Sequence, residues 1–537
     1  MSKNIDDVTR SFEGLVVSNA ESQDQAPLHQ TPPRQISCRQ TPLRQTPFRQ
    51  TALQDLSRTL IQFAEMTLLH EKPVSSALDD IGATGSINIT EISYLLETAT
   101  RLEDVVGTFT NTADKIIEAA VHSVIEHLQK LGASHITPDS QAHRLLIQLD
   151  VEIKKIVRNV LRGSNNSEPI LWKIAEECYN QAVRKSGALH ADNYIDTHKE
   201  ANQEHHEHEG RLYINEDYAE LWRMYRPDGD AREKGSWVGF WVEVLRRSPG
   251  GPTLFYPPES CTSIPSGDKF VDAPPYLFRV FDQRSAGKSN NDVIASQMSI
   301  SEELREQSRI DMLSLDARLA TERFHSHIHA EKLFDRRDDS ENLMSWTSSL
   351  LFALQYAIFR SSSKISNVTT RDVQICAVET KRFPPGQFVS DMWLLPIYHQ
   401  TAQEIGGETE SFLKFRYNNE EYYNGEYFSQ GLVDHSGRSC VVSLEALIHS
   451  GLYDLYPQLN DRYGKYKWSK RVLELREVWD KQQRTMRQEM EQAVSIAKTF
   501  SEPAELDIAL ILLTFKNRQY NSMISGGELF AIFNRFH

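Results

Sequence analysis

The longest regular pattern in the chain is a run of apolar residues from Ile92 to Leu128. Its apolar positions are one, three or four residues apart throughout, which is the spacing of one face of an α-helix. Asn88 and Glu91 stand before the run at capping-box spacing, with Asn in place of the usual Ser or Thr. Gly132 follows the run and is a plausible helix stop. The pattern predicts one long amphipathic helix.

Two further helices are expected after it, one from near Pro138 to Gly163 and one from near Pro169. Together they predict a helical bundle over residues 53–186. The apolar face of the long helix is either the core of this bundle or a surface for a partner. Short connections between neighbouring helices favour the core.

The pattern changes to alternating strands and helices after Tyr276. Strands are expected at Tyr276–Phe281, Leu343–Thr347, Val373–Glu379, Tyr422–Val433 and Cys440–Ser443. Helices are expected at Asn291–Arg323, at Leu350–Arg360 and over most of the chain beyond Leu444, including a charged stretch at 467–498. The expected fold class is therefore α+β, a mixed β core flanked by helices and preceded by an all-α bundle.

These patterns divide the chain into five segments: a disordered arm at 1–52, the bundle at 53–186, a polar junction and extension at 187–270, the α+β domain at 271–455 and a C-terminal helical region at 456–537. The arm repeats a pentad similar to Arg-Gln-Thr-Pro. It is either a solvated linker or a regulatory arm, since phosphorylation of its threonines would offset the arginine charge.

Composition narrows the classes of function. The formal net charge of −15 argues against a general nucleic-acid binder, which needs basic surface. No run of apolar residues is long enough to span a membrane, and the first residues lack the apolar core of a signal peptide. The five cysteines are far apart and contain no Cys-x-x-Cys pair, which suits a reducing compartment. We expect an intracellular protein of the cytoplasm or nucleus.

Two features carry candidate chemistry. Ser345 to Ser349 hold four hydroxyls and a tryptophan directly before an apolar helical run, although one hydroxyl is enough to cap a helix. Arg279 stands among apolar residues of an expected strand, where a guanidinium needs an anion or several acceptors. It either clamps a phosphate or ribose, or pairs with a carboxylate such as Asp282 or Glu379.

These residues carry a resemblance. Three segments, in this order, resemble the Arg–Ser–Glu pattern of ADP-ribosyltransferases, most of all the cholera-toxin-like branch. They are Leu277–Asp282, Met344–Ser349 and Gly425–Gly431. Ser345-Trp-Thr347 occupies the place of the Ser-Thr-Ser centre of that branch. The same region also resembles a fungal family of uncharacterised domains marked by the Ser-Trp-Thr-Ser-Ser block. The resemblance implies an ADP-ribosyltransferase-like fold with NAD as the substrate.

The resemblance also implies roles. Glu426 would stabilise the oxocarbenium charge that develops as the nicotinamide–ribose bond breaks. Arg279 would hold a phosphate or ribose, and Ser345 would orient Glu426 and the nicotinamide amide. Thr347 belongs to the same NAD-binding set, and Tyr356 or Tyr427 would lie against the nicotinamide ring. The expected activity is mono-ADP-ribosyl transfer to a protein acceptor, or hydrolysis of NAD.

The alternative is a catalytically inactive relative that acts as an interaction protein, because a shared fold does not carry function. Such a protein would bind partners or oligomerise through its helical regions. A metal site is not expected. His325, His327 and His329 would share a face on a strand, but only His325 and His329 would align on a helix, and no nearby ligand completes a set.

Overall fold

The protein is described here by a computed structural model. It describes residues 62, 65, 89–137, 140–163, 170–193, 235–256, 273–329, 340–362, 368–419, 423–481, 483–484, 487–500 and 504–519. The arm at 1–52, with its pentad repeats, lies outside them. The described chain forms two compact units, one of residues 89–133 and 146–174, and one of residues 134–145 and 175–519.

The described chain is helical from residue 89 to residue 183, which covers the first unit and the beginning of the second. α3 spans Ile89–Leu131 without a break, which confirms the long helix expected from the apolar pattern. The expected second helix is two helices, α4 (Gln141–Gln148) and α5 (Asp150–Gly163). Asp150 begins α5, where a carboxylate stabilises the free N–H groups of a helix start. α6 (Ile170–Val183) confirms the third helix.

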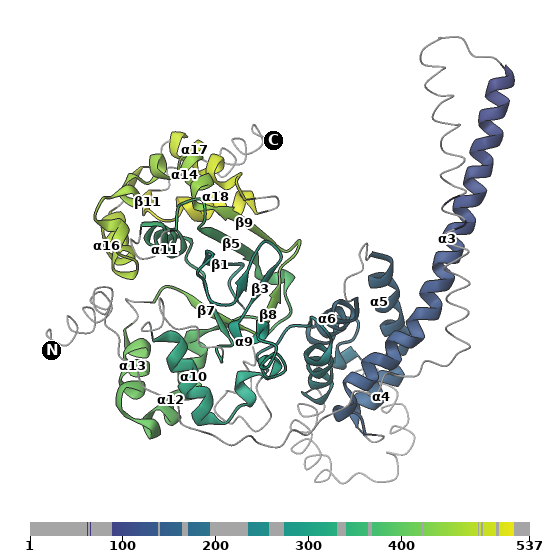
Figure 1. The fold of residues 1–537 in the computed structure, drawn as a ribbon, viewed down its shortest axis with the longest axis horizontal. Helices are drawn as coiled ribbons and strands as arrows, with labels where there is room; N and C mark the ends of the chain where they lie inside the picture. The colour runs from purple at the N-terminus through teal and green to yellow at the C-terminus, as the bar shows by residue number, and fades with distance from the viewer. Residues whose placement is uncertain are drawn as a thin grey trace, which may run out of the picture. The chain divides into compact units, whose positions relative to one another are not determined.

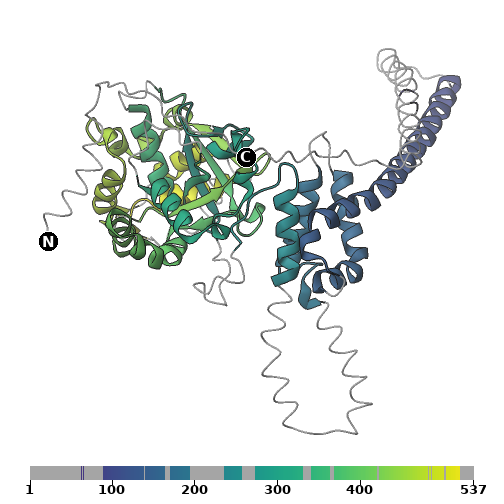
Figure 2. The same ribbon diagram turned by 60° about the horizontal axis from the view of Figure 1, so that its bottom comes forward.

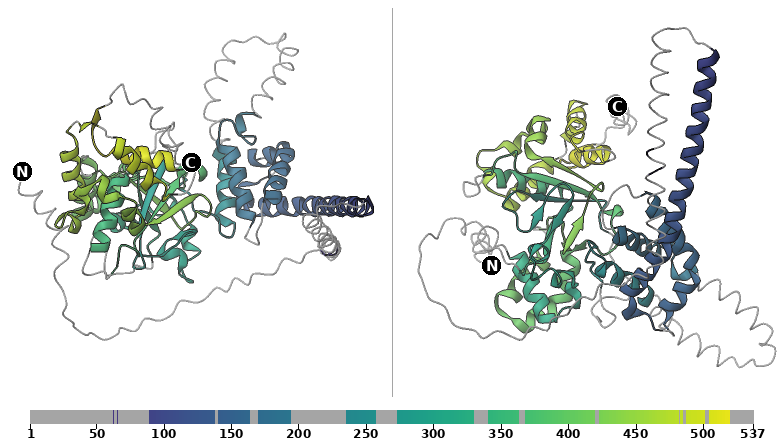
Figure 3. Two further views of the ribbon diagram at one scale, coloured as in Figure 1. Left: turned by 90° about the horizontal axis from the view of Figure 1, so that it is seen from above. Right: turned by 45° about the vertical axis from the view of Figure 1, so that its right-hand side comes forward.

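α5 packs along the C-terminal part of α3. Val121, Ile125 and Leu128 of α3 are buried, as are Ile153 and Val157 of α5. Two ion pairs flank these apolar residues, joining Arg158 to Glu118 and Arg162 to Asp114. Figures 2 and 3 show that α3 continues well past the end of α5.

The second unit is built on a six-stranded antiparallel sheet with the order β6-β7-β4-β1-β5-β9. Its strands are β1 (Tyr276–Phe281), β4 (Leu343–Thr347), β5 (Gln374–Glu379), β6 (Val389–Ser390), β7 (Glu426–Gln430) and β9 (Ser439–Ser443). Strands were expected at five of these places, all but β6, and the mixed α+β class is confirmed. Figure 1 shows β1 near the centre of this unit, with helices on either side.

A second, smaller sheet has the order β2-β3-β8, from β2 (Lys288–Ser289), β3 (Val293–Ala295) and β8 (Leu432–Asp434). Ile294 and Val433 of this sheet share an apolar cluster with Leu277, Met344 and Trp346 of the large sheet. The prediction of helix over Asn291–Arg323 is therefore wrong at its start. After β3 come the short α9 (Gln297–Ile300) and two 3₁₀ helices (Gln307–Arg309 and Met312–Ser314), and the long helix α10 begins only at Ala317.

The main core lies under α11 (Leu350–Ser362), whose buried side chains pack on Phe278 and Ile375. The C-terminal helices complete this core, and Figure 1 shows them grouped at the β9 end of the sheet. They are α14 (Leu444–His449), α15 (Leu452–Leu455), α16 (Ser469–Trp479), α17 (Arg487–Ala497) and α18 (Glu505–Leu513), with β10 (Gln483–Arg484) paired to β11 (Arg518–Gln519).

The other end of the sheet carries α10 (Ala317–Ile328), α12 (Asp391–Ile405) and α13 (Gly407–Asn418), grouped near β7 in Figure 1. The sequence analysis did not predict α12 or α13. Residues 235–247 form a further helix, and its apolar side chains Trp237, Phe240 and Trp241 are fully buried. Across the described helices, none combines the length and apolar character that crossing a membrane requires.

Candidate functional site

Arg279 links the two central strands β1 and β4. These strands share one registered pair, Phe278 with Thr347. Beyond that pair, Nη1 of Arg279 donates a hydrogen bond of 2.7 Å to the backbone oxygen of Ser345. Burial lowers the pKa of the Arg279 guanidinium from its ordinary value. Its Nε is buried and makes no hydrogen bond to any described residue, so it keeps an unused donor.

The register of β4 and β7 places three of the expected site residues on one face of the sheet. Thr347 pairs with Glu426, and Ser345 pairs with Phe428. Side chains two residues apart on a strand point to the same side, so Ser345, Thr347 and Glu426 share a face. Arg279, Ser345 and Glu426 lie on three consecutive strands, but Arg279 follows Phe278, which pairs with Thr347, so its side chain leaves β1 on the opposite face.

Glu426 is held by a cation that the sequence analysis did not single out. Nη2 of Arg416, on α13, lies 2.6 Å from Oε2 of Glu426 and 2.6 Å from Oδ2 of Asp391 at the start of α12. Burial, with the negative charge of Glu426 as the second cause, raises the pKa of Asp391 to about 6. Burial also opposes the charge of Arg416, but its two carboxylates outweigh this and raise its pKa.

The other expected NAD-binding residues make structural contacts. Thr347 donates from Oγ1 to the backbone oxygen of Asn424 at 2.6 Å. Tyr356 is half-buried on α11, and its ring centroid lies 5.3 Å from that of Trp468. Tyr427 is also half-buried, and burial raises its pKa to about 12.

Trp346 does not stand between these residues. It alternates with Ser345 along β4, and its side chain is therefore on the opposite face. There the indole is 2 % exposed, and its Nε1 donates to Oγ of Ser429 at 2.8 Å. Phe388 packs against it edge to face, with ring centroids 5.2 Å apart. The tryptophan is a core residue behind the site.

The side-chain oxygen of Ser345 also forms a hydrogen bond. Nε2 of His327, on α10, lies 2.8 Å from Oγ of Ser345. Nδ1 of the same ring contacts Oε1 of Glu341, two residues before β4. A carboxylate only accepts hydrogen bonds, so this contact assigns the ring proton to Nδ1 and leaves Nε2 to accept the proton of the Ser345 hydroxyl. Serine, histidine and glutamate are thus joined in one chain.

The helix α10 places His327 by its periodicity. Ala320, Phe324 and His327 are four and three residues apart, so they lie on one face of the helix. Phe324 and His327 both pack edge to face on the ring of Phe428. His325 stacks on His329 on another side of the helix, as the sequence analysis expected for a helix. Within the described ranges, no group of three or more His, Cys, Asp or Glu side chains is placed to hold a metal ion.

Glu341 is fixed by its own neighbours in the chain. Its backbone oxygen accepts a hydrogen bond from the backbone nitrogen of Met298. Next to it, Asn342 accepts from Ser296 and Gly431 and donates to the backbone oxygen of Ser308. The segment that leads into β4 is therefore bound to three other parts of the fold, the start of α9, Ser308 and Gly431, which orients the Glu341 carboxylate.

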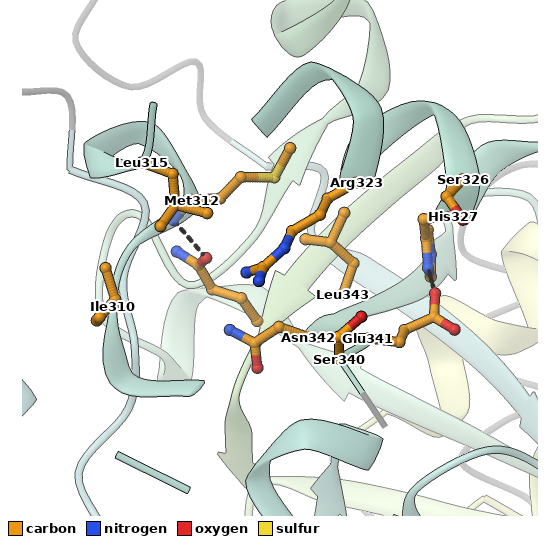
Figure 4. A pocket seen from close by; sticks show the side chains of 11 residues that line it. Ile310, Met312, Leu315, Arg323, Ser326, His327, Ser340, Glu341, Asn342 and Leu343 are labelled. Atoms are coloured by element: carbon orange, nitrogen blue, oxygen red, sulfur yellow. Dashed lines mark hydrogen bonds and ion pairs between the residues drawn. The ribbon is translucent and has the colours of Figure 1, made fainter. Parts of the chain in front are cut away.

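A small pocket opens beside this chain of residues (Figure 4). Its volume is about 40 Å³. His327 and Glu341 form one end, with their contact drawn in Figure 4, and apolar side chains form much of the wall. The lining residues are Ile310, Met312, Leu315, Arg323, Ser326, His327, Ser340, Glu341, Asn342, Leu343 and Gln430. The pocket is therefore mixed, with apolar side chains such as Met312 and Leu343 and with polar groups at His327, Glu341 and the guanidinium of Arg323.

The structure brings Arg279 and Ser345 into contact and sets Glu426 on the neighbouring strand. Tyr356 lies among aromatic residues on α11, and its hydroxyl accepts a hydrogen bond from Nη1 of Arg360 at 3.4 Å. Sequence reasoning considered His327 only as a metal ligand and did not single out Glu341. The signal that was available is the helical spacing of Ala320, Phe324 and His327, which places this histidine on the buried face of a helix.

Comparison with known proteins gives one match. Residues 272–436 match a family described as a domain of unknown function (DUF7587). This agrees with the expected resemblance to an uncharacterised domain family over the same region, and the match does not address the ADP-ribosyltransferase resemblance. The chain has no significant match among curated proteins or solved structures.

Proposed function

We propose that the second unit binds NAD and transfers its ADP-ribosyl group to a protein acceptor or to water. The observation that carries the proposal is the placement of Arg279, Ser345 and Glu426 on the consecutive strands β1, β4 and β7. Two of the three are in contact through the guanidinium of Arg279 and the backbone of Ser345. The Arg–Ser–Glu resemblance predicts these three residues for one site.

The charges around the site fit an anionic substrate. Arg279 keeps a buried Nε without a described partner, and a phosphate oxygen would satisfy this donor. Glu426 retains 25 % side-chain exposure at the start of β7. A carboxylate there would stabilise positive charge that develops on the ribose as nicotinamide leaves. Arg416 fixes the direction of that carboxylate.

The test is NAD binding and turnover by the full chain. We expect binding by calorimetry, release of nicotinamide, and loss of release by ~100-fold or more in Glu426→Gln, as for other lost electrostatic groups. Glu379→Gln is the matched control, because Glu379 ends β5 in the same sheet. Absence of NAD binding by the folded protein would exclude the proposal.

The second candidate function is an interaction protein that works through its helical regions. The observation in its favour is on α3, where Leu96 is 64 % and Val106 is 44 % exposed. Both lie before Asp114, the first residue of α3 that forms an ion pair with α5. Sedimentation should then show self-association or a stable complex that Leu96→Glu with Val106→Glu abolishes. A monomer that is unchanged by these substitutions would argue against this function.

A further inference from the structure

The chain of hydrogen bonds from Ser345 through His327 to Glu341 has the parts of a nucleophilic site. A serine hydroxyl is activated when a histidine within hydrogen-bond reach takes its proton and a carboxylate orients the ring. Here Oγ of Ser345 is 2.8 Å from Nε2 of His327, and Nδ1 of the ring contacts Glu341. The side chains of His327 and Glu341 keep 12 % and 27 % exposure.

The three residues stand on rigid parts of the fold. Ser345 is in the central part of β4, where it pairs with Phe428 of β7. His327 is on the inner face of α10, packed on Phe428. Glu341 is held by the hydrogen bonds of its own backbone and of Asn342. Sites built on such elements keep their geometry without rearrangement on binding.

We propose that Ser345, His327 and Glu341 form a catalytic triad that hydrolyses esters with a small acyl group. The proposal does not depend on NAD chemistry. The pocket beside His327 has apolar wall residues and a volume of about 40 Å³, which is room for a group of a few heavy atoms. His327 and Glu341 line this pocket, and Ser345 bonds to His327 from outside the lining. A small acyl chain against Met312 and Leu343 would direct its carbonyl carbon toward His327.

The reaction balances with water alone. Oγ of Ser345 bonds to the acyl carbon, its proton passes to Nε2 of His327, and the ester C–O bond breaks as that proton passes to the leaving alkoxide. The same histidine then takes a proton from water, whose oxygen attacks the acyl carbon. The acyl C–Oγ bond breaks as the histidine returns that proton to Oγ, and the carboxylic acid leaves. Glu341 stabilises the imidazolium in both halves.

Arg279 fixes the strand that carries the nucleophile. Its Nη1 donates a hydrogen bond of 2.7 Å to the backbone oxygen of Ser345. Arg279 follows Phe278, which pairs with Thr347, so its side chain leaves the sheet on the face opposite that of the Ser345 hydroxyl. Arg279 would therefore hold β4 in position for the reaction.

The experiment uses the full chain and a fluorophosphonate probe, which forms a stable bond only with an activated serine. We expect a single adduct, mapped to Ser345 by mass spectrometry. His327→Gln should slow labelling by ~100-fold or more, the usual contribution of a general base. His329→Gln is the matched control, because it alters a histidine on the same helix that points elsewhere, and it should label at the wild-type rate.

Two outcomes would overturn the proposal. One is a folded wild-type protein that takes no label, or takes it on another residue. The other is equal labelling of the wild type and His327→Gln. Glu426→Gln separates this site from the proposed NAD site, because it should stop NAD turnover and leave labelling of Ser345 unchanged. Circular dichroism of each variant shows that a lost label does not reflect a lost fold.

Discussion

Arg416 holds the carboxylate of Glu426 at 2.6 Å, across the end of the sheet from α13 to the first residue of β7. The same nitrogen of Arg416 contacts Asp391, so one cation balances two carboxylates. The cation is 21 % exposed and Asp391 is 2 % exposed. The direction of Glu426, the residue expected to carry charge in the proposed transfer, therefore depends on a residue outside the recognised motif.

Removing the guanidinium of Arg416 should lower the stability of the folded protein. Arg416→Met leaves two carboxylates facing each other, and we expect a loss of about 3–5 kcal/mol in the free energy of unfolding, measured with urea at pH 8. Because the pKa of Asp391 is already raised to about 6, the loss should be smaller at pH 5, where Asp391 binds a proton. Adding Asp391→Asn to Arg416→Met should recover part of the stability. Equal losses at both pH values would contradict this account.

A second buried pair gives a prediction that is independent of either proposed activity. Arg360 on α11 binds Asp282 after β1 with two hydrogen bonds of 2.7 and 2.8 Å, and Asp282 is fully buried in its side chain. Arg360→Met should lower the free energy of unfolding by about 3–5 kcal/mol, since it strands a buried charge.

The exposed pair of Arg318 and Glu322 supplies the comparison for Arg360. Arg318→Met should change the free energy of unfolding by less than about 1 kcal/mol, because exposed ion pairs contribute little. If Arg360→Met and Arg318→Met lower the free energy of unfolding equally, burial does not determine the contribution of the Arg360–Asp282 pair. Thermal and urea unfolding of the two variants side by side would decide it.

Asp311 should make stability depend on pH. Burial raises its pKa to about 6, against an ordinary value of 3.8, although Gln430 and two backbone N–H groups bind it. Between those values the folded protein holds a proton that the unfolded chain has lost. The stabilisation is present below pH 4 and is lost as the pH rises through 6, with a slope of at most about 1.4 kcal/mol per pH unit. Asp391 titrates in the same pH range, so Asp311→Asn should reduce the slope of the urea-unfolding profile without abolishing it. A slope equal to that of the wild type would contradict the assignment.

Gly425 should be intolerant of any side chain. Its φ is +65°, and an added Cβ would lie 1.9 Å from Oγ of Ser348. Gly437 has the same φ of +65° with nothing within 4 Å of an added Cβ, so it is a matched control for backbone strain alone. Gly437→Ala should cost about 1 kcal/mol, the typical penalty of this conformation. Gly425→Ala should lower the free energy of unfolding, measured with urea, by more than this. It should also reduce NAD turnover, because Glu426 is the next residue. Equal losses of stability in the two variants would mean that Ser348 moves aside freely.

The sequence pattern was a good guide where one periodicity continues over many residues. α3, β1, β4 and α11 lie where the apolar spacing predicts them. The segment after Asn291 was mistaken for helix because short strands and turns have too few residues to show a period.

Contacts across the sheet could not be read from spacing. Ser345 and Arg279 were singled out, but their partnership depends on how β1 and β4 separate after one registered pair. His327 and Glu341 are close in sequence, yet only the docking of α10 on Phe428 makes them neighbours of Ser345. Arg416 lies on a helix that the analysis did not predict, so its hold on Glu426 was also missed.

The apolar core under α11 sets a limit on how the chain can be divided. The family match ends at residue 436, three residues before β9 begins at the edge of the sheet. The same core takes buried side chains from α14 through α18, as far as Leu512. A gene fragment that stops at the family boundary would encode the sheet without β9. It would also lack α14 to α18, the helices that bury the apolar side chains of α11. The portable unit, the piece that can be moved into another protein and still fold, therefore extends at least to α18.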